Sequence, residues 1–339
     1  MASSIVPLSE VPRAAFESYL RATSGFYRDR DPGLIGWKYF DPDFNRDRCR
    51  GMVWMRRGEV SGFIGAIPAA MQQGSDVRPL NWTCEWGLRA PKTSPGIGVK
   101  LLHALIGKVE NVAGAGGNEN STTLGPRMAA HSFTDAGLFL WRPLRASSLF
   151  QLAAMRVPAL GALATSPLGR VPIPIWLGAR RPTVRTHAGV APVFDRLIDQ
   201  LRPAAWTARY DQHYLAWAIE RCPGLESATC DAPGAASVAW YATANAVRHV
   251  RFALWAAPDA EAAARDVIAE TVRGARATGA AIMSTIVSRW DTELIAALRR
   301  AGFLPRPAKL PLYLFMPAVD RLAGLNYFAA DMAQRFRST

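Results

Sequence analysis

The sequence has few of the residues that hold metal ions or form disulfides. Its four cysteines lie far apart with no Cys-x-x-Cys pair, and its five histidines are scattered. Zinc sites need ligands at short spacings, and disulfide frameworks need paired cysteines in a short secreted chain. The composition therefore predicts no metal site and free thiols in a reducing compartment.

Long apolar runs are also missing. No uninterrupted apolar stretch approaches the roughly 20 residues that cross a bilayer. The first residues, MASSIVPLSEVPRAAF, contain no apolar core of a signal peptide. We expect no membrane span and a cytoplasmic protein. Half of the 339 residues are hydrophobic, so the chain should fold, and it is long enough for two domains.

Acidic residues are outnumbered, with 27 Asp and Glu against 40 Lys and Arg, a formal net charge of +13. This excess favours an anionic partner: a nucleotide-like cofactor, an acidic carrier protein, nucleic acid or an anionic membrane surface. The alternative is that the positive charge simply keeps the protein soluble. Because no helix-turn-helix, zinc or aromatic-basic signature is present, we expect no nucleic-acid partner.

What the chain does contain is a strand, a glycine loop and a helix in succession within residues 82–112. Apolar residues alternate up to Leu88, prolines interrupt the pattern, and after Gly96-Ile97-Gly98 apolar residues recur at threes and fours. Free N–H groups and the positive helix end then converge where glycine permits close approach, which suits a phosphate. The stretch lacks the third glycine of a dinucleotide fingerprint and the Gly-Lys-Ser/Thr of a Walker loop.

The loop Thr93-Ser94-Pro95-Gly96-Ile97-Gly98 resembles motif A of the Gcn5-related N-acetyltransferases (GNAT), Gln/Arg-x-x-Gly-x-Gly/Ala, with Thr93 in place of the leading residue. In that family the loop binds the pyrophosphate of an acyl-CoA, and a backbone N–H near the end of the fourth strand holds the thioester oxygen. The resemblance implies acetyl-CoA or another acyl-CoA as co-substrate. It assigns to the donor site Leu88, Arg89, Ala90, Lys92, Ser94, Pro95, Gly96, Ile97, Gly98, Val99 and Asn120. The alternative is an ordinary glycine turn between a strand and a helix.

A second GNAT-like motif, Asn-x-x-Ala-x-x-x-Tyr-x-x-x-Gly-Phe, is matched by Ala129 and Gly137, with Pro126 and Phe133 as replacements. The family tyrosine commonly protonates the leaving thiolate, and phenylalanine has no proton to give. Water or His131 could act instead, or the thiolate needs no help, since a thiol pKa is about 8.5. Around this motif we expect a strand over residues 118–124, a helix over 127–136 and a strand over 139–144.

The second half of the chain repeats the first weakly. Tyr214-Leu215-Ala216-Trp217 echoes Leu34-Ile35-Gly36-Trp37. However, Pro258-Asp259-Ala260 stands where the phosphate loop should be, and Asp259 brings negative charge there. The resemblance thus extends over nearly the whole chain, as two tandem α/β domains, each with a mixed, mostly antiparallel sheet flanked by helices. We predict an acyl-CoA-binding GNAT domain over residues 1–145 and a degenerate one over 186–339.

Residues 146–185 are apolar and interrupted by prolines. We predict a linker that crosses the surface and packs on both halves. The alternative is a patch that contacts a membrane or a protein partner.

Acyl transfer to an amine needs a group that takes the amine proton. Glu85 is the one acid of the strand before the glycine loop, and its apolar neighbours should raise its pKa toward a useful range. The alternative is that Glu85 pairs with an arginine on the solvent face. Trp37 and Asp41 are candidates for binding the acceptor, although a tryptophan is more often a core anchor and an aspartate a turn residue.

The sequence therefore predicts transfer of an acyl group, most simply acetyl, from acyl-CoA to a small amine or amino sugar by direct attack in a ternary complex. One alternative is a donor carried by an acyl carrier protein, whose acidic surface would suit the basic chain. Another is a catalytically inactive scaffold that binds a partner. The oligomeric state, including a homodimer, is left open.

Overall fold

The computed structural model describes residues 3–24, 27, 33–45, 48–90, 94–117, 119–154, 157–174, 184–190, 193–201, 203–244, 247–257 and 259–323. Its first half contains β1 (Ser3–Pro7), the short turn η1 (Leu8–Glu10), α1 (Arg13–Thr23), α3 (Gly33–Phe40), α4 (Pro42–Asn45), β2 (Gly51–Arg56), β3 (Glu59–Gln73), β4 (Asp76–Leu88), α5 (Ile97–Ile106), β5 (Val112–Ala115), α6 (Glu119–Met128) and β6 (His131–Pro143).

A small helical lobe and the second half follow. The lobe contains α7 (Ala146–Ala154), η3 (Pro158–Leu160), α8 (Gly161–Thr165) and η4 (Pro167–Arg170). The second half contains β7 (Arg185–Ala188), α9 (Val193–Gln200), β8 (Thr207–Arg209), α10 (Gln212–Leu215), the π-helical turn η5 (Ala216–Glu220), β9 (Glu226–Ala232), β10 (Ala235–Ala244), β11 (Val247–Ala256), α11 (Glu261–Ala277), β12 (Ile282–Ser288), α12 (Thr292–Arg300) and β13 (Leu304–Leu314).

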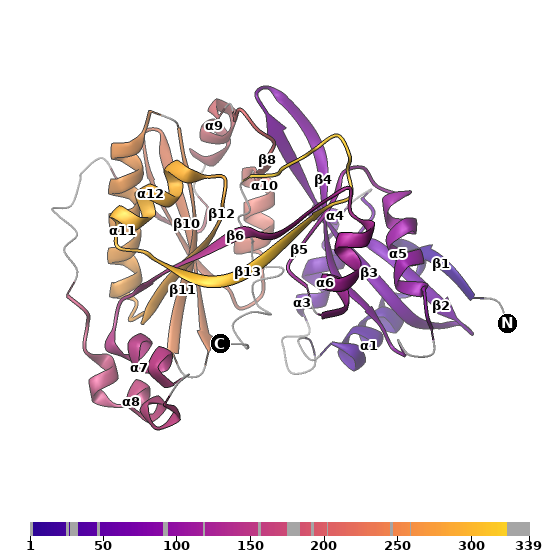
Figure 1. Cartoon of the computed structure of the whole chain (residues 1–339), viewed down its shortest axis with the longest axis horizontal. Coiled ribbons are helices and arrows are strands. Elements are labelled where there is room, and N and C mark those ends of the chain that lie inside the picture. Colours follow the sequence, from indigo (N-terminus) through magenta and orange to yellow (C-terminus); the bar gives the residue numbers. More distant parts are fainter. Residues whose placement is uncertain are drawn as a thin grey trace.

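The described strands form one 13-stranded sheet in the order β1-β2-β3-β4-β5-β13-β6-β12-β11-β10-β9-β7, with β8 beside β3. β6 and β13 run across the centre of the molecule and join its two halves (Figure 1). The last described strand, β13, pairs with β5, whereas β6 pairs with β12. Each half thus gives one strand to the other, so the predicted units 1–145 and 186–339 share one sheet.

The same order of strand pairing occurs in both halves. β2, β3 and β4 pair antiparallel, and β4 pairs parallel to β5 through α5. β9, β10 and β11 pair antiparallel, and β11 pairs parallel to β12 through α11. Between β5 and β12 there are three antiparallel pairings: β5 with β13, β13 with β6, and β6 with β12. The parallel pair β4–β5 therefore runs in the opposite direction to the parallel pair β11–β12.

Different helices pack on the two faces of the sheet, and successive residues of a strand contact them in turn. On β2, Val53 packs with α1 in the largest core cluster, while Met52 and Trp54 pack with α5. On β10, Val238 belongs to the same large cluster, while Ala239 packs with α11. The large cluster is therefore continuous across both halves, as expected when successive strand residues point to opposite faces.

The predicted mixed α/β fold with a mostly antiparallel sheet flanked by helices is confirmed. The predicted strand–loop–helix unit is present as β4 and α5. Two local predictions were wrong: residues 118–124 fall largely in helix α6, and residues 131–136, predicted as helix, belong to strand β6. Residues 131–136 are a strand because β6 pairs with β12 and β13. Both partners come from the other end of the chain, so the local sequence pattern around residues 131–136 does not reveal them.

Candidate functional site

β4 and β5 separate from one another at the centre of the first half. Their parallel register contains only Asn81↔Val112 and Trp82↔Ala113, although β4 continues to Leu88. From Thr83 onward, the edge of β4 that faces β5 carries no register pair with it. We call this opening the first splay. It leaves this edge of β4 without strand pairing to β5 next to the glycine loop.

A bulge in β4 accompanies the first splay. The register with β3 shifts between the pairs Phe63↔Gly87 and Gly65↔Cys84, so two residues of β4 lie opposite one residue of β3. Glu85 lies in this bulge with φ +45°, a left-handed conformation that few non-glycine residues adopt. The strand therefore changes direction at Glu85 and needs neighbouring contacts that hold it there.

The Glu85 carboxylate is buried in a cluster of polar side chains. Lys38 Nζ lies 2.6 Å from Oε1, the Tyr27 hydroxyl donates to the same oxygen at 2.6 Å, and the Tyr39 hydroxyl donates to Oε2. Burial acts to raise the pKa of Glu85, but Lys38 and the tyrosine hydrogen bonds outweigh it and hold the pKa below its ordinary value. The side chains of Lys38 and Glu85 are only 1% and 4% exposed.

These contacts correct the expectation for Glu85. Its pKa is lowered and not raised, and its partner is a buried lysine and not an arginine on the solvent face. A base of low pKa takes a proton weakly, so this carboxylate is poorly suited to deprotonating an amine. Lys38, the one charged residue in the apolar stretch of α3, was the sequence signal that could have revealed the pair.

The turn before α5 has features of an anion site. Gly96 has φ +76°, and a Cβ at its position would meet nothing within 4 Å, so the space before the helix is open. No side chain caps the start of α5, and its first turn has no acidic residue. The Ser94 hydroxyl is buried without a hydrogen-bond partner. An orphaned hydroxyl beside uncapped helix N–H groups fits the phosphate groups of coenzyme A.

The other predicted donor residues border this turn. Leu88 pairs with Gly62 at the end of β4, and the exposed Arg89 donates its N–H to Ser61 O at 2.9 Å. Trp86 Nε1 donates to Gly98 O at 3.1 Å and ties β4 to the first turn of α5. The remaining donor predictions are placed as follows: Ala90 is exposed beyond β4, Pro95, Ile97 and Val99 lie in the turn and first helical residues, Asn120 lies in α6 with its side chain outside the description, and Lys92 lies outside the described residues.

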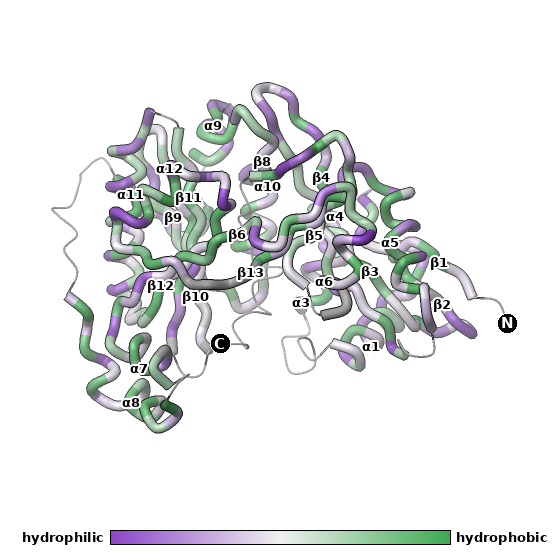
Figure 2. The backbone as a smooth tube through the Cα atoms, viewed as in Figure 1, coloured by the Kyte–Doolittle hydropathy of each residue, from purple (hydrophilic) through white to green (hydrophobic). Residues whose placement is uncertain are grey.

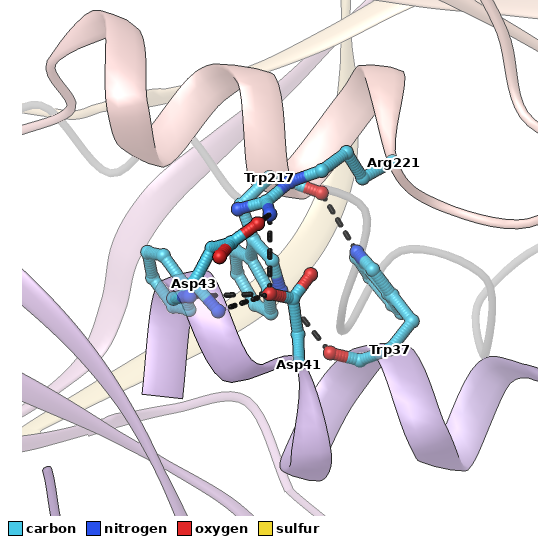
Figure 3. Close-up of polar contacts among 6 residues, drawn as sticks. Trp37, Asp41, Asp43, Trp217 and Arg221 are labelled. Carbon is cyan, nitrogen blue, oxygen red and sulfur yellow. Dashed lines mark hydrogen bonds and ion pairs between the residues drawn. The ribbon is translucent and has the colours of Figure 1, made fainter. Parts of the chain in front are cut away.

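The predicted acceptor residues lie at the junction of the two halves (Figure 3). Trp37 and Trp217 stack at 4.9 Å between ring centroids; Trp37 Nε1 donates to Trp217 O at 2.7 Å and Trp217 Nε1 to Trp37 O at 3.2 Å. Asp41 accepts the N–H groups of Asp43 and Phe44 and pairs with Arg221 at 3.1 Å. Trp37 is thus engaged in a reciprocal contact between the two segments whose sequences echo each other, and Asp41 is engaged in an ion pair beside that contact.

Arg50 is a buried cation that sequence reasoning missed. Its Nη2 donates to Lys38 O, and its guanidinium lies 5.3 Å from the ring centroids of Phe44 and Trp217. Nε and Nη1 are buried without a partner, and burial lowers the Arg50 pKa to about 10. Arg50 and Lys38 together give the interior near Glu85 more positive than negative charge.

Phe133 does not occupy the place predicted for it. It lies on β6, edge to face with Trp290 at 5.0 Å, and His131 Nε2 lies 3.2 Å from Pro317 O. Because the family tyrosine was matched on a helix, the alignment of Phe133 with it is wrong. The element after β5 is α6, which carries Thr122 and Thr123.

A second splay opens between β11 and β12. Their parallel register ends at Arg251↔Ser284, although β11 continues to Ala256. A cavity of about 790 Å³ lies at this end of β11, lined by Gln72, Ile198, Leu201, Pro203, Ala204, Thr207, Ala208, Arg209, Tyr210, Leu254, Trp255, Ala256, Ala257, Glu261, Ala264, Trp290, Asp291, Thr292, Glu293, Leu294, Ala296, Ala297 and Arg300. Helix α11 starts there after Ala260, with Glu261 in its first turn.

Within the described parts of the chain, no group of His, Cys, Asp or Glu is arranged to hold a metal ion. No described helix is long and apolar enough to cross a membrane.

No family model and no curated protein matches this sequence. Solved structures do. A GCN5-related N-acetyltransferase from Anabaena variabilis has a TM-score of 0.58 at 12% identity, covering 92% of this chain and 72% of its own. The chain has the GNAT fold. Saccharomyces cerevisiae N-myristoyltransferase with bound myristoyl-CoA has a TM-score of 0.57 at 11% identity, covering 96% of this chain and 85% of its own.

Eis1 from Mycobacterium abscessus also matches this GNAT-fold chain, with a TM-score of 0.50 at 13% identity, covering 93% of this chain and 74% of its own. At such identities the likeness concerns the fold. Each of these matches extends over both halves of the chain, because it covers at least 92% of it.

Proposed function

We propose that this GNAT-fold chain is an N-acyltransferase that moves an acyl group from acyl-CoA to the amine of a small molecule or amino sugar. The observation that carries the proposal is the turn at α5, where the first splay meets Gly96 in a left-handed conformation and the unpartnered Ser94 hydroxyl. The names of the fold neighbours, which include acyltransferases and one with bound myristoyl-CoA, support the same class of reaction.

In this proposal the donor is held by the turn and by the edge of β4. The Ser94 hydroxyl and the N–H groups of Gly98 and Val99 bind the pyrophosphate, and Lys92 and Lys100 add positive charge. The backbone N–H of Leu88 binds the thioester oxygen, since the N–H of Arg89 already donates to Ser61 O. Bound acyl-CoA supplies an activated carbonyl, which the amine attacks directly in a ternary complex.

We assign Glu85 a positioning role in place of the general base. Its carboxylate is held by Lys38, Tyr27 and Tyr39, and this cluster holds the β4 bulge at Glu85, which lies within the first splay. Water can take the proton from an amine that enters partly deprotonated. A thiolate leaves readily near neutral pH without an acid, since a thiol pKa is about 8.5.

An inactive scaffold is the second candidate function. The engaged Glu85 carboxylate favours it, because the base expected from the sequence is not free. A donor on an acyl carrier protein remains a variant of the first proposal. The second half, with an acid in place of the phosphate turn, would shape the acceptor site or a dimer contact.

The discriminating experiment is thermal unfolding with acetyl-CoA, longer acyl-CoAs and free coenzyme A. A ligand at 100 times its Kd stabilises the folded state by about 2.7 kcal/mol. We expect acyl-CoA to raise the Tm of the wild-type protein and to leave Gly96→Asp unchanged. If no coenzyme A derivative shifts the Tm, the assignment of the donor site is wrong. A Tm shift without acyl transfer to any amine in a panel of acceptors indicates the inactive scaffold.

A further inference from the structure

A small helical lobe lies within residues 146–185, the segment predicted as a linker between the two halves. Its described part, residues 146–174, folds into α7, η3, α8 and η4 at one margin of the molecule (Figure 1). Its two ends are fastened together: Ala146 N–H donates to Val171 O at 2.9 Å, and Ile173 N–H donates to Leu144 O at 3.0 Å. It is a closed projection from the end of β6, and no described lobe residue belongs to the three core clusters.

The surface of the lobe is apolar. Leu149, Val157, Leu168 and Val171 are 44%, 50%, 58% and 52% exposed. Only two other large apolar side chains of the described chain are comparably exposed, Val77 and Leu304. Figure 2 shows the hydrophobic character of this lobe around α7 and α8. Among the exposed described residues of the lobe, only Thr165 and Arg170 are polar. Such a concentration marks an interaction surface.

The charge of the same segment has one sign. No Asp or Glu occurs from residue 136 to residue 194, a range that includes the lobe and contains Arg142, Arg145, Arg156, Arg170, Arg180, Arg181 and Arg185. Arg142 is buried and donates to Ala301 O, so it does not add charge to the lobe surface. Arg170 is exposed between Leu168 and Val171. Arg145 lies at the base of the lobe, where its backbone forms an isolated antiparallel β-bridge with Pro172. Apolar side chains flanked by arginines without carboxylates form the pattern of proteins that lie on an anionic bilayer surface.

We propose that this lobe docks the protein on an anionic lipid surface. Leu168, Val171 and the neighbouring apolar side chains enter the headgroup boundary, and Arg170, with Arg145 at the base of the lobe, contacts phosphate groups. A second copy of the chain is the weaker occupant, because an isologous contact would set these arginines against one another without a carboxylate from the segment to neutralise them. The proposal concerns location and does not depend on the proposed activity.

The test is flotation of the full-length protein with phosphatidylcholine vesicles, with and without phosphatidylglycerol. We expect binding to the anionic vesicles that weakens as salt rises, and little binding to phosphatidylcholine alone. Leu168→Asp and Val171→Asp should each lower the partition coefficient at least about tenfold, since an apolar contact is lost and a repelled charge is added. Arg170→Gln should lower it about fivefold, on anionic vesicles only.

Val77→Asp and Leu304→Asp are matched controls, because these side chains are 47% and 49% exposed and lie outside the lobe. Both should bind vesicles as the wild type does, and all variants should keep the wild-type Tm. Absence of vesicle binding, or equal losses in lobe and control variants, would overturn the proposal. So would light scattering that shows a vesicle-free oligomer dissociated by Leu168→Asp, which would assign the lobe to a second copy.

Discussion

The two splays are built from the same strand order and differ in the residues at the start of the helix that follows. In the first, Gly96 takes φ +76°, the first turn of α5 has no acid, and Ser94 is buried without a partner. In the second, Ala260 precedes α11, and Glu261 occupies its first turn in a pair with Arg300. The strand order thus produces an opening in each half, and the few residues at the start of the following helix determine which opening suits an anion.

The strand edges beside the two openings differ as well. The first contains the left-handed Glu85 with its buried lysine and tyrosine partners. In the second, residues 252–255 of β11 are Phe, Ala, Leu and Trp, all buried in the core. Residues 252–255 at the second opening therefore have no counterpart of the Glu85 carboxylate of the first.

Gly96→Asp should have the largest effect on this contrast. A carboxylate about 4 Å from the pyrophosphate costs about 4 kcal/mol at an intermediate effective dielectric, close to a thousandfold in affinity. We expect no acyl-CoA binding by calorimetry and a protein that remains folded. Gly224→Asp is the control, since Gly224 also has a positive φ, +71°, and open space around it. Unchanged affinity in Gly96→Asp would remove the motif assignment.

Glu85→Gln should strongly destabilise the fold, because Lys38 would stay buried without its charge partner. The expected loss is about 3–5 kcal/mol in the free energy of unfolding, measured with urea at neutral pH. The pKa of Glu85 is lowered, so its contribution is present above the ordinary value of 4.5 and is lost as pH falls through the folded pKa. The difference between the wild type and the variant should therefore shrink in acid.

The rate of Glu85→Gln separates positioning from base catalysis. Loss of a general base typically costs about 10²–10⁴-fold and recovers as pH rises and the amine deprotonates itself. A positioning role predicts a defect with the same size at all pH values where the variant is folded. Replacing both charges, in Glu85→Gln with Lys38→Met, should recover stability; recovery of the rate with rising pH would restore Glu85 as the base.

Trp37→Phe and Trp217→Phe test the point where the halves meet. Each change removes one indole hydrogen bond and leaves a buried carbonyl of the partner unpaired, at about 1–3 kcal/mol. Because the contact is reciprocal, the two losses should be similar, and a double-mutant cycle should show coupling. An acyl-CoA affinity that stays unchanged would place both residues in the fold and not in the donor site.

Glu261→Gln should have the smallest effect. Its pair with Arg300 is exposed, and removing the charge does not create a left-handed glycine or a free hydroxyl. We expect calorimetry to give one acyl-CoA per chain for both the wild type and this variant. A stoichiometry near two in either protein would show that the second splay also binds the donor and that the two openings do not differ in this respect.

The sequence alone was sufficient for the parts of the site that are local. The alternation of β4, the glycine turn and the periodic helix α5 lie within one stretch, and so does the absence of that turn before α11. Local pattern carries such features because φ preferences, prolines and apolar spacing act over a few residues. The mostly antiparallel α/β fold followed from the same stretch and its resemblance.

Only the tertiary structure decided the rest. The pKa of Glu85 depends on Lys38, which is 47 positions away in the chain, and Trp37 and Asp41 are engaged by residues 180 positions away. The exchange of β6 and β13 likewise rests on pairing between opposite ends of the chain. Burial and charge are set by whichever residues the fold brings together, so apolar neighbours in sequence predicted a raised pKa where a buried ammonium group lowers it.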